Sequence, residues 1–220
     1  MNRSVTQALV GCALAAALAA TLPSPAIAGV PSATNSTLPA CMVLCPMGDM
    51  PFSVTVRDLA NNPLNGASVV ISFDFGACEN SVFICEQLPS DPYLVNAPAL
   101  TIRMFTDANG NVTFPARVGG TAPAGCVGVF ANGVLLRTYA LASPDQNGNG
   151  MTANLLDPGD FALFAAKLGT ADPTADLDCD GGLVDADDQV IYSIHAAHSC
   201  VGYVDAVSRK SWGSLKLHYR

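Results

Sequence analysis

The chain has few charges, few basic side chains and few aromatic rings. Of its 220 residues 13% are charged, and 18 acidic residues outnumber 10 basic ones, which gives a net charge of −8. Nucleic-acid binding needs a surface rich in Lys and Arg, so this composition argues against a nucleic-acid partner. Its 19 glycines and 15 prolines separate short Val-rich runs. Such frequent turns argue against a helical bundle.

Residues 1–28 have the pattern of a bacterial secretory (Sec) signal peptide. A basic residue near the start precedes an apolar run over 8–22, and Ala26-Ile27-Ala28 is a small-residue cleavage site. We expect an exported mature chain that begins near Gly29, is secreted or lies at the cell surface, and has no transmembrane segment. A membrane anchor would need about 20 apolar residues. Lipoprotein cleavage before Cys12 would leave most of the apolar run on the mature side.

Export gives the cysteines an oxidising environment. Besides Cys12, the chain contains seven of them: Cys41, Cys45, Cys78, Cys85, Cys126, Cys179 and Cys200. We expect disulfides and one unpaired thiol. Spacing favours Cys78–Cys85 and Cys179–Cys200, although connectivity cannot be deduced from a sequence. Zinc binding by Cys41 with Cys45 is an alternative, but no histidine stands near this pair in the sequence.

Four stretches follow the leader. Residues 29–40 are a polar linker bounded by prolines, and residues 41–142 contain short β-patterned runs separated by turns. Residues 143–200 are acidic and contain two similar loop-then-helix units, and residues 201–220 form a basic tail. The predicted organisation is therefore a multidomain, mainly β protein with a small α unit after the β domain.

The β stretch is predicted to be an antiparallel β-sandwich. Period-two alternation and turn residues predict strands over 52–58, 67–75, 100–105, 112–118, 126–130 and 134–139. Asn132-Gly133 predicts a two-residue hairpin. Pro115 cannot donate to a ladder and indicates an edge strand. Several short antiparallel strands with such turns are typical of sandwiches.

Three segments carry a resemblance to known β-modules. Residues 54–58 (VTVRD), 62–69 (NPLNGASV) and 106–114 (TDANGNVTF) resemble bacterial immunoglobulin-like modules of the intimin/invasin type and related carboxypeptidase-regulatory-like domains. The resemblance implies an immunoglobulin-like sandwich over about 50–142 that acts as a spacer or adhesive unit. The cysteine-bearing insertion 76–97 departs from the pattern, and a ligand site there is the alternative.

The second acidic loop has the spacing of an EF-hand calcium loop. Its expected oxygen ligands, at loop positions 1, 3, 5, 7 and 12, are Asp176, Asp178, Asp180, the Gly182 carbonyl and Asp187. Gly181 stands at position 6, where the loop must turn sharply. Carboxylates packed so closely repel one another unless a cation lies between them. We therefore predict Ca²⁺ at this loop.

A related loop begins 31 residues before Asp176. Its expected ligands are Asp145, Asn147, Asn149, Met151 (carbonyl) and Asp160. Relative to the second loop it carries a four-residue insertion before Asp160, and two asparagines replace acids. We expect this loop to bind calcium more weakly.

A helix is predicted after each loop. Residues 161–168 place apolar side chains at i, i+3, i+4 and i+7, which is typical of an amphipathic helix. The second helix follows Asp187 and is expected to bury Val190, Ile191 and Ile194.

Two loop-plus-helix repeats over 143–200 resemble a type I dockerin, an extracellular calcium-dependent attachment module. The resemblance implies a cohesin-like protein partner and a place in polysaccharide-degrading complexes. Dockerins contact their partner through loop positions 10 and 11, often with small hydroxyl residues. Here those positions hold Asp185 and Ala186 in one repeat and Pro158 and Gly159 in the other, which departs from the family pattern.

No catalytic constellation appears in the sequence, so we predict a non-enzyme. His195 and His198 stand close to Cys200 and suggest either a metal site or, as we prefer, a polar helix face. The expected function is a secreted, calcium-binding modular protein for extracellular attachment or complex assembly. The alternative is a carbohydrate-binding component of a polysaccharide-degrading complex.

Overall fold

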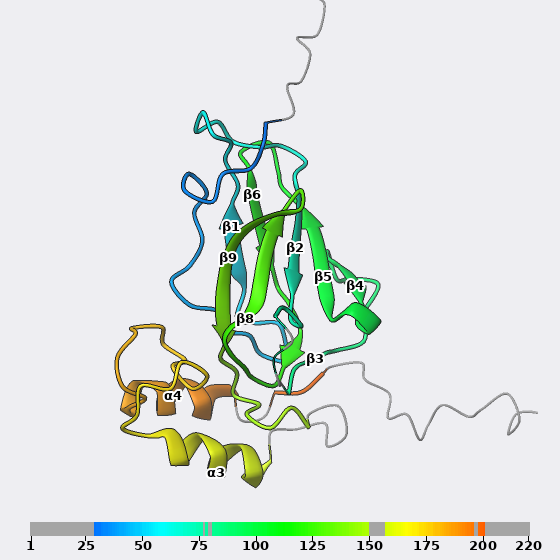
Figure 1. The fold of residues 1–220 in the computed structure, drawn as a ribbon. Helices are drawn as coiled ribbons and strands as arrows, with labels where there is room; N and C mark the ends of the chain where they lie inside the picture. Colours follow the sequence, from blue (N-terminus) through cyan, green and yellow to red (C-terminus); the bar gives the residue numbers. More distant parts are fainter. Residues whose placement is uncertain (1–28, 77, 79–80, 150–156, 196–197, 201–220) are drawn as a thin grey trace, which may run out of the picture.

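The computed structural model describes residues 29–76, 78, 81–149, 157–195 and 198–200. The predicted signal peptide and basic tail lie outside these residues. These described residues are mainly β, with antiparallel sheets and two α-helices at one end of the strands (Figure 1). Among the described residues no helix is both long and apolar enough to cross a bilayer.

Three sheets make up the β unit. The largest has the order β4-β5-β2-β8-β9, and β1 pairs with β6 and β3 with β7. The strands are β1 (Phe52–Thr55), β2 (Ser68–Ser72), β3 (Phe83–Ile84), β4 (Leu94–Asn96), β5 (Thr101–Phe105), β6 (Asn111–Phe114), β7 (Val118–Gly119), β8 (Ala122–Ala131) and β9 (Val134–Leu141). A 3-10 turn, η1 (Ala97–Ala99), joins β4 to β5. Each predicted strand run therefore overlaps at least one observed strand.

One hydrophobic core joins the five-stranded sheet to the β1–β6 pair. Val69 and Ile71 of β2 are fully buried, and Phe114 of β6 lies in the same cluster. The rings of Phe52 in β1 and Tyr139 in β9 meet edge to face, with centroids 5.5 Å apart. The alternation of buried and exposed side chains is what the period-two pattern predicted.

The predicted hairpin is confirmed. Asn132 and Gly133 both have positive φ, 46° and 82°, as a two-residue turn between β8 and β9 requires. The Asn132 side-chain oxygen also accepts a hydrogen bond from the Ser68 amide at 2.9 Å. Pro115 lies after the last residue of β6 and outside any strand, so the predicted strand over 112–118 ends before this proline.

Residues 29–40 differ from the expected linker because they lie along β1. The amide of Thr37 donates to the Thr55 carbonyl, and the amide of Thr55 donates to the Thr37 carbonyl, both at 2.9 Å. The Tyr139 hydroxyl donates to the Pro39 carbonyl at 2.9 Å, and Leu38 packs against the core. This polar stretch bonds through its backbone, which residue polarity alone does not reveal.

Both favoured disulfide pairs were wrong. The structure pairs Cys41 with Cys179, Cys78 with Cys126 and Cys85 with Cys200. Cys45 is the free, buried thiol. Two of these bonds join the β unit to the acidic unit, so short spacing along the chain was a poor guide to pairing.

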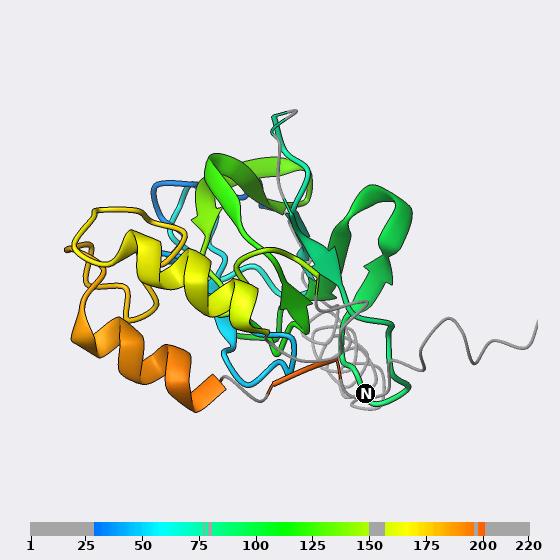
Figure 2. The same cartoon turned by 90° about the horizontal axis from the view of Figure 1, so that it is seen from below.

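Helices α3 (Pro158–Lys167) and α4 (Ala186–His195) lie side by side at the end of the β unit (Figures 1 and 2). Phe164 and Tyr192 stack at 4.7 Å and are the buried rings of a small second core. The expected face of α4 was wrong for Val190 and Ile194, which are 58% and 64% exposed, whereas Ile191 packs against this second core as expected. The helix turns Tyr192 inward instead, because this ring stacks on α3.

Candidate metal centre

The second acidic loop is closed by the carboxylate of Asp188. Its Oδ1 accepts hydrogen bonds from the amides of Leu177 at 2.6 Å and Asp178 at 3.1 Å. Its Oδ2 accepts from the Asp185 amide at 2.9 Å. Asp188 is buried in the first turn of α4, so one side chain ties the start of the loop to the start of the helix.

Asp160 closes the first loop in the same way. Its Oδ1 accepts from the amides of Gln146 at 2.9 Å and Asn147 at 3.1 Å, and its Oδ2 accepts from the Asp157 amide at 2.8 Å. Asp157 caps α3 and accepts from the amide of Asp160, which makes a reciprocal capping box. The two closures therefore share one hydrogen-bond pattern.

The loop starts repeat as well. The amide of Gly148 donates to Asp145 at 2.8 Å, and the amide of Cys179 donates to Asp176 at 2.8 Å. One step on, Asn147 accepts from the Asn149 amide at 2.9 Å, and Asp178 accepts from the Asp180 amide at 3.0 Å. The internal repeat predicted from the sequence is thus a repeat of backbone geometry.

The structure brings Asp188, rather than the predicted Asp187, to the second loop. Asp187 is exposed, and its amide donates to the Asp185 side chain at 2.8 Å. The prediction of Asp187 came from counting EF-hand positions strictly from Asp176. With Asp188 matched to Asp160, the first loop is three residues longer than the second, not four.

Three carboxylates converge in the second loop. Oxygen atoms of Asp176, Asp178 and Asp188 all lie within 4.8 Å of one another. Burial raises the pKa of Asp176, and the neighbouring acids Asp178 and Asp188 raise it further. This electrostatic conflict is the kind that a bound cation relieves.

The remaining predicted ligands of the second loop lie further out. Asp180 is exposed, and its side chain accepts from the Gly182 amide at 2.6 Å. Gly182 is also exposed. These two residues are outside the cluster of three carboxylates, although they remain on the same loop.

The first loop has less negative charge at its ligand positions. Asp145 and Asp160 are fully buried, while the amides of Asn147 and Asn149 replace acids. The Asn149 side chain donates to Asp157 at 2.8 Å. Met151 lies outside the described residues.

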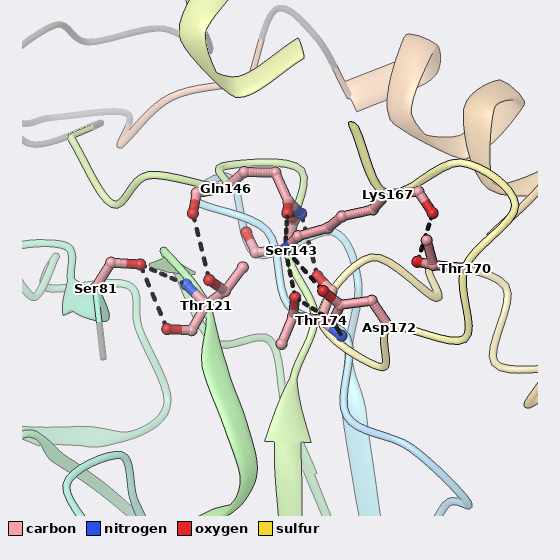
Figure 3. Close-up of polar contacts among 8 residues, drawn as sticks. All are labelled: Ser81, Thr121, Ser143, Gln146, Lys167, Thr170, Asp172 and Thr174. Atoms are coloured by element: carbon pink, nitrogen blue, oxygen red, sulfur yellow. Dashed lines mark hydrogen bonds and ion pairs between the residues drawn. The ribbon is translucent and has the colours of Figure 1, made fainter. Parts of the chain in front are cut away.

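Polar side chains hold the first loop against its surroundings (Figure 3). The Gln146 side chain donates to the carbonyls of Ser143 at 2.6 Å and Thr174 at 3.1 Å. Lys167 reaches back from the end of α3 and donates to the Gln146 side chain at 2.7 Å. The hydroxyl of Thr121, just before β8, donates to the Gln146 carbonyl at 3.3 Å. Gln146 thereby joins the loop to both the β unit and α3.

A second cluster was missed by the preferred sequence interpretation. His195 and His198 do not form a polar helix face but lie beside Cys45 and Asp49, with one ligand atom of each residue within 4.8 Å of the others. Burial raises the pKa of the Cys45 thiol to about 12. The odd number of cysteines and the His195-x-x-His198 spacing were the available signs of this cluster.

Comparisons of the chain with protein-family models, curated proteins and solved structures find no match. The dockerin-like and immunoglobulin-like resemblances therefore remain predictions. Function has to be argued from the repeated loops and their carboxylates.

Proposed function

We propose that this chain is a secreted, non-catalytic modular protein that binds Ca²⁺ through its two loop-helix repeats and uses the acidic unit for extracellular attachment or complex assembly. The observation that carries this proposal is the repeated loop closure by Asp160 and Asp188. Three disulfides are compatible with the extracellular environment of this proposal.

The chemistry of the second loop fits a hard cation. Ca²⁺ takes six to eight oxygen ligands at about 2.3–2.6 Å, mainly from carboxylates and carbonyls. Asp176, Asp178 and Asp188 offer carboxylates in one place, and small rotations of the Asp180 side chain and the Gly182 carbonyl would add oxygens from the same loop. We therefore propose Asp188 in place of Asp187 as the closing ligand.

The first loop is the weaker proposed site. Asp145 and Asp160 would supply its two carboxylates, and the amide oxygens of Asn147 and Asn149 would complete part of the shell. Fewer negative ligands lower the affinity of a calcium loop. The nearby ammonium group of Lys167, which contacts Asp172 at 3.6 Å, further reduces the negative potential around this loop.

An apolar face on α4 supports the attachment role. Val190 and Ile194 are exposed beside Ala186, Gln189 and Ser193, which together line an open hollow of about 510 Å³. Exposed apolar patches with a polar rim are typical of protein interaction sites. In this proposal, calcium holds α4 in position. The β unit, an immunoglobulin-like sandwich, supports α4. A cohesin-like or other extracellular protein is the proposed partner.

Calcium-dependent ordering tests the metal-binding proposal. Circular dichroism of the full chain, in chelator and then in millimolar Ca²⁺, should show a gain of helix while the β signal persists. Asp176→Ala should remove most of that gain, and Asn147→Ala should remove less because the first loop is the weaker site. Equal helix content in both solutions for the unmodified chain contradicts the proposal.

Partner capture tests attachment. Extracellular proteins of the source organism should bind the immobilised chain in calcium and elute in chelator. Val190→Asp with Ile194→Asp should abolish capture without changing calcium binding. The control is Leu59→Asp, since Leu59 is an exposed apolar residue of the β unit, 75% accessible. Capture that is unaffected by the α4 variant would place the partner surface elsewhere.

Carbohydrate binding is the second candidate. An open hollow of about 610 Å³ lies between the units, lined by Ser81, Thr121, Pro123, Ala124, Asp172, Pro173 and Thr174. Hydroxyl and carboxylate groups there could bond to sugar hydroxyls, although no aromatic ring is among these lining residues. Binding on a glycan array that is lost in Asp172→Ala would favour this candidate over protein attachment.

A further inference from the structure

Four potential metal ligands from two distant segments meet at the end of the β unit. Cys45 and Asp49 stand four residues apart across a turn in which the Gly48 amide donates to the Cys45 carbonyl at 2.9 Å. His195 ends α4, and the His198 amide donates to the His195 carbonyl at 2.9 Å. Each segment therefore presents two ligand side chains from a single turn of backbone.

The four ligand atoms face one point. The Sγ of Cys45 lies 3.3 Å from the Nδ1 of His198, and the two histidine Nδ1 atoms are 2.9 Å apart. The Oδ2 of Asp49 is 3.4 Å from the Nδ1 of His195 and 3.3 Å from that of His198. The two nitrogens and the oxygen form a triangle, the sulfur lies against the His198 nitrogen, and one ligand atom of each of the four residues lies within 4.8 Å of the others.

Hydrogen bonding alone does not account for this cluster of four side chains. The Nδ1 of His198 has three polar neighbours, namely Cys45, His195 and Asp49. A ring nitrogen carries either one hydrogen or one in-plane lone pair, so it can satisfy one such neighbour well. Lone pairs that converge on a common centre, by contrast, are what a metal ion requires.

We propose that Cys45, Asp49, His195 and His198 bind a single Zn²⁺ ion, at a site separate from the calcium loops. Zinc is held tetrahedrally by thiolate, imidazole and carboxylate, at bond lengths that place neighbouring ligand atoms about 3.3–3.6 Å apart. Three of the four distances above are within about 0.1 Å of this range, and the 2.9 Å histidine contact would widen on metal binding. A thiolate and a carboxylate also balance the charge of a divalent cation.

The fold holds the two halves of this site in place. The Cys85–Cys200 disulfide anchors the chain two residues after His198, and the Sγ of Cys85 contacts the carbonyl of Pro46 at 3.4 Å. Cys45 is fully buried, and the side chains of His195 and His198 are 12% and 18% exposed. Asp49, at 41% side-chain exposure, leaves a route for the ion to enter. Four protein ligands with little exposure are typical of a structural rather than a catalytic zinc site.

Metal titration of the full, disulfide-bonded chain tests this proposal. The protein is stripped with a chelator and then titrated with Zn²⁺ or Co²⁺ in saturating Ca²⁺, which occupies the acidic loops. We expect one zinc per chain and, with cobalt, tetrahedral d–d bands together with a thiolate-to-metal charge-transfer band. Cys45→Ser should abolish the charge-transfer band, and His198→Gln should weaken zinc binding by more than about tenfold, the loss that even outer-shell changes produce.

Matched variants make the outcome decisive. His218→Gln changes the remaining histidine of the chain, and Asp176→Asn changes the calcium loop; neither should alter zinc affinity or the cobalt spectrum. Asp49 lies on the exposed side of the site, so Asp49→Asn removes a ligand while leaving the core intact. Absence of stoichiometric zinc binding by the unmodified chain overturns the proposal. So does zinc binding that persists in Cys45→Ser and His198→Gln, or a cobalt spectrum without thiolate charge transfer.

Discussion

Asp187 and Asp188 are adjacent in the sequence but have opposite surroundings. Asp188 is 2% exposed and accepts from three backbone amides, whereas Asp187 is exposed at the surface of α4. A buried amide without its acceptor costs about 1–3 kcal/mol. Asp188 therefore has a structural role that does not depend on metal binding.

We predict that Asp188→Ala lowers the free energy of unfolding by about 3 kcal/mol or more, since three amides lose one acceptor. Asp187→Ala should change it by about 0.5 kcal/mol or less, as exposed substitutions usually do. Urea unfolding in millimolar Ca²⁺, where we expect α4 to be folded, measures this difference. Equal effects of the two substitutions would contradict the assignment of Asp188 as the closing residue.

The sequence predicted residue types in the two acidic loops better than the position of the closing acid. Asp176 and Asp178 were predicted as ligands, and their carboxylates lie together with that of Asp188. The carboxylate that closes this loop belongs to Asp188, one residue after the predicted Asp187. Cys45 and His195 could not be associated from spacing, since they are separated by most of the chain and meet only through tertiary structure.

At the scale of elements, the β8–β9 hairpin depends on two residues with positive φ. Gly133 has φ 82°, and a Cβ added there would meet no atom within 4 Å. A β-branched side chain at this position is therefore opposed by backbone conformation rather than by crowding.

We expect Gly133→Val to lower the free energy of unfolding by about 1–2 kcal/mol, the cost of a left-handed conformation for an L-residue. Asn132→Asp should be nearly neutral, because aspartate tolerates positive φ and can still accept from the Ser68 amide. Thermal or urea unfolding of both variants provides the measurement. An unchanged midpoint for Gly133→Val would show that the turn has another conformation.

Strands were predictable and helix faces were not. Alternation in β1 and β2 reflects a single buried face, so polarity along each strand is enough to identify it. In α4, Val190 and Ile194 looked like the core face, yet Tyr192 is the buried residue because its ring stacks on Phe164. A short helix over a small core is oriented by one such contact, which periodicity alone does not reveal.

Across the molecule, two disulfides join the β unit to the acidic unit, which the sequence pattern predicted to be separate domains. The Cys41–Cys179 bond closes a segment with a sequence separation of 138, and Cys85–Cys200 closes one of 115. Pairing was mispredicted because distance along the chain carries no information about which loops meet in space. The acidic unit is consequently cross-linked to the β unit by two disulfides and is not joined to it by the backbone alone.

Peptide mapping of the unreduced protein should recover three cross-linked pairs, Cys41–Cys179, Cys78–Cys126 and Cys85–Cys200, with Cys45 as a free thiol. Replacing Cys41 and Cys179 together with alanine should cost about 2–5 kcal/mol, because the bond restricts a long loop of the unfolded chain. Mass spectrometry and urea unfolding measure the two results. Recovery of Cys78–Cys85 or Cys179–Cys200 would contradict the observed architecture.

Calcium binding by the repeated loops is most directly tested by calorimetric titration of the full chain with Ca²⁺, compared with Asp188→Asn. We predict saturable binding by the unmodified chain and at least one site lost in the variant. A ligand at a hundredfold excess over its Kd stabilises the folded state by about 2.7 kcal/mol, so unfolding midpoints should rise in parallel. No binding at millimolar Ca²⁺, with an unchanged unfolding midpoint, would contradict the account.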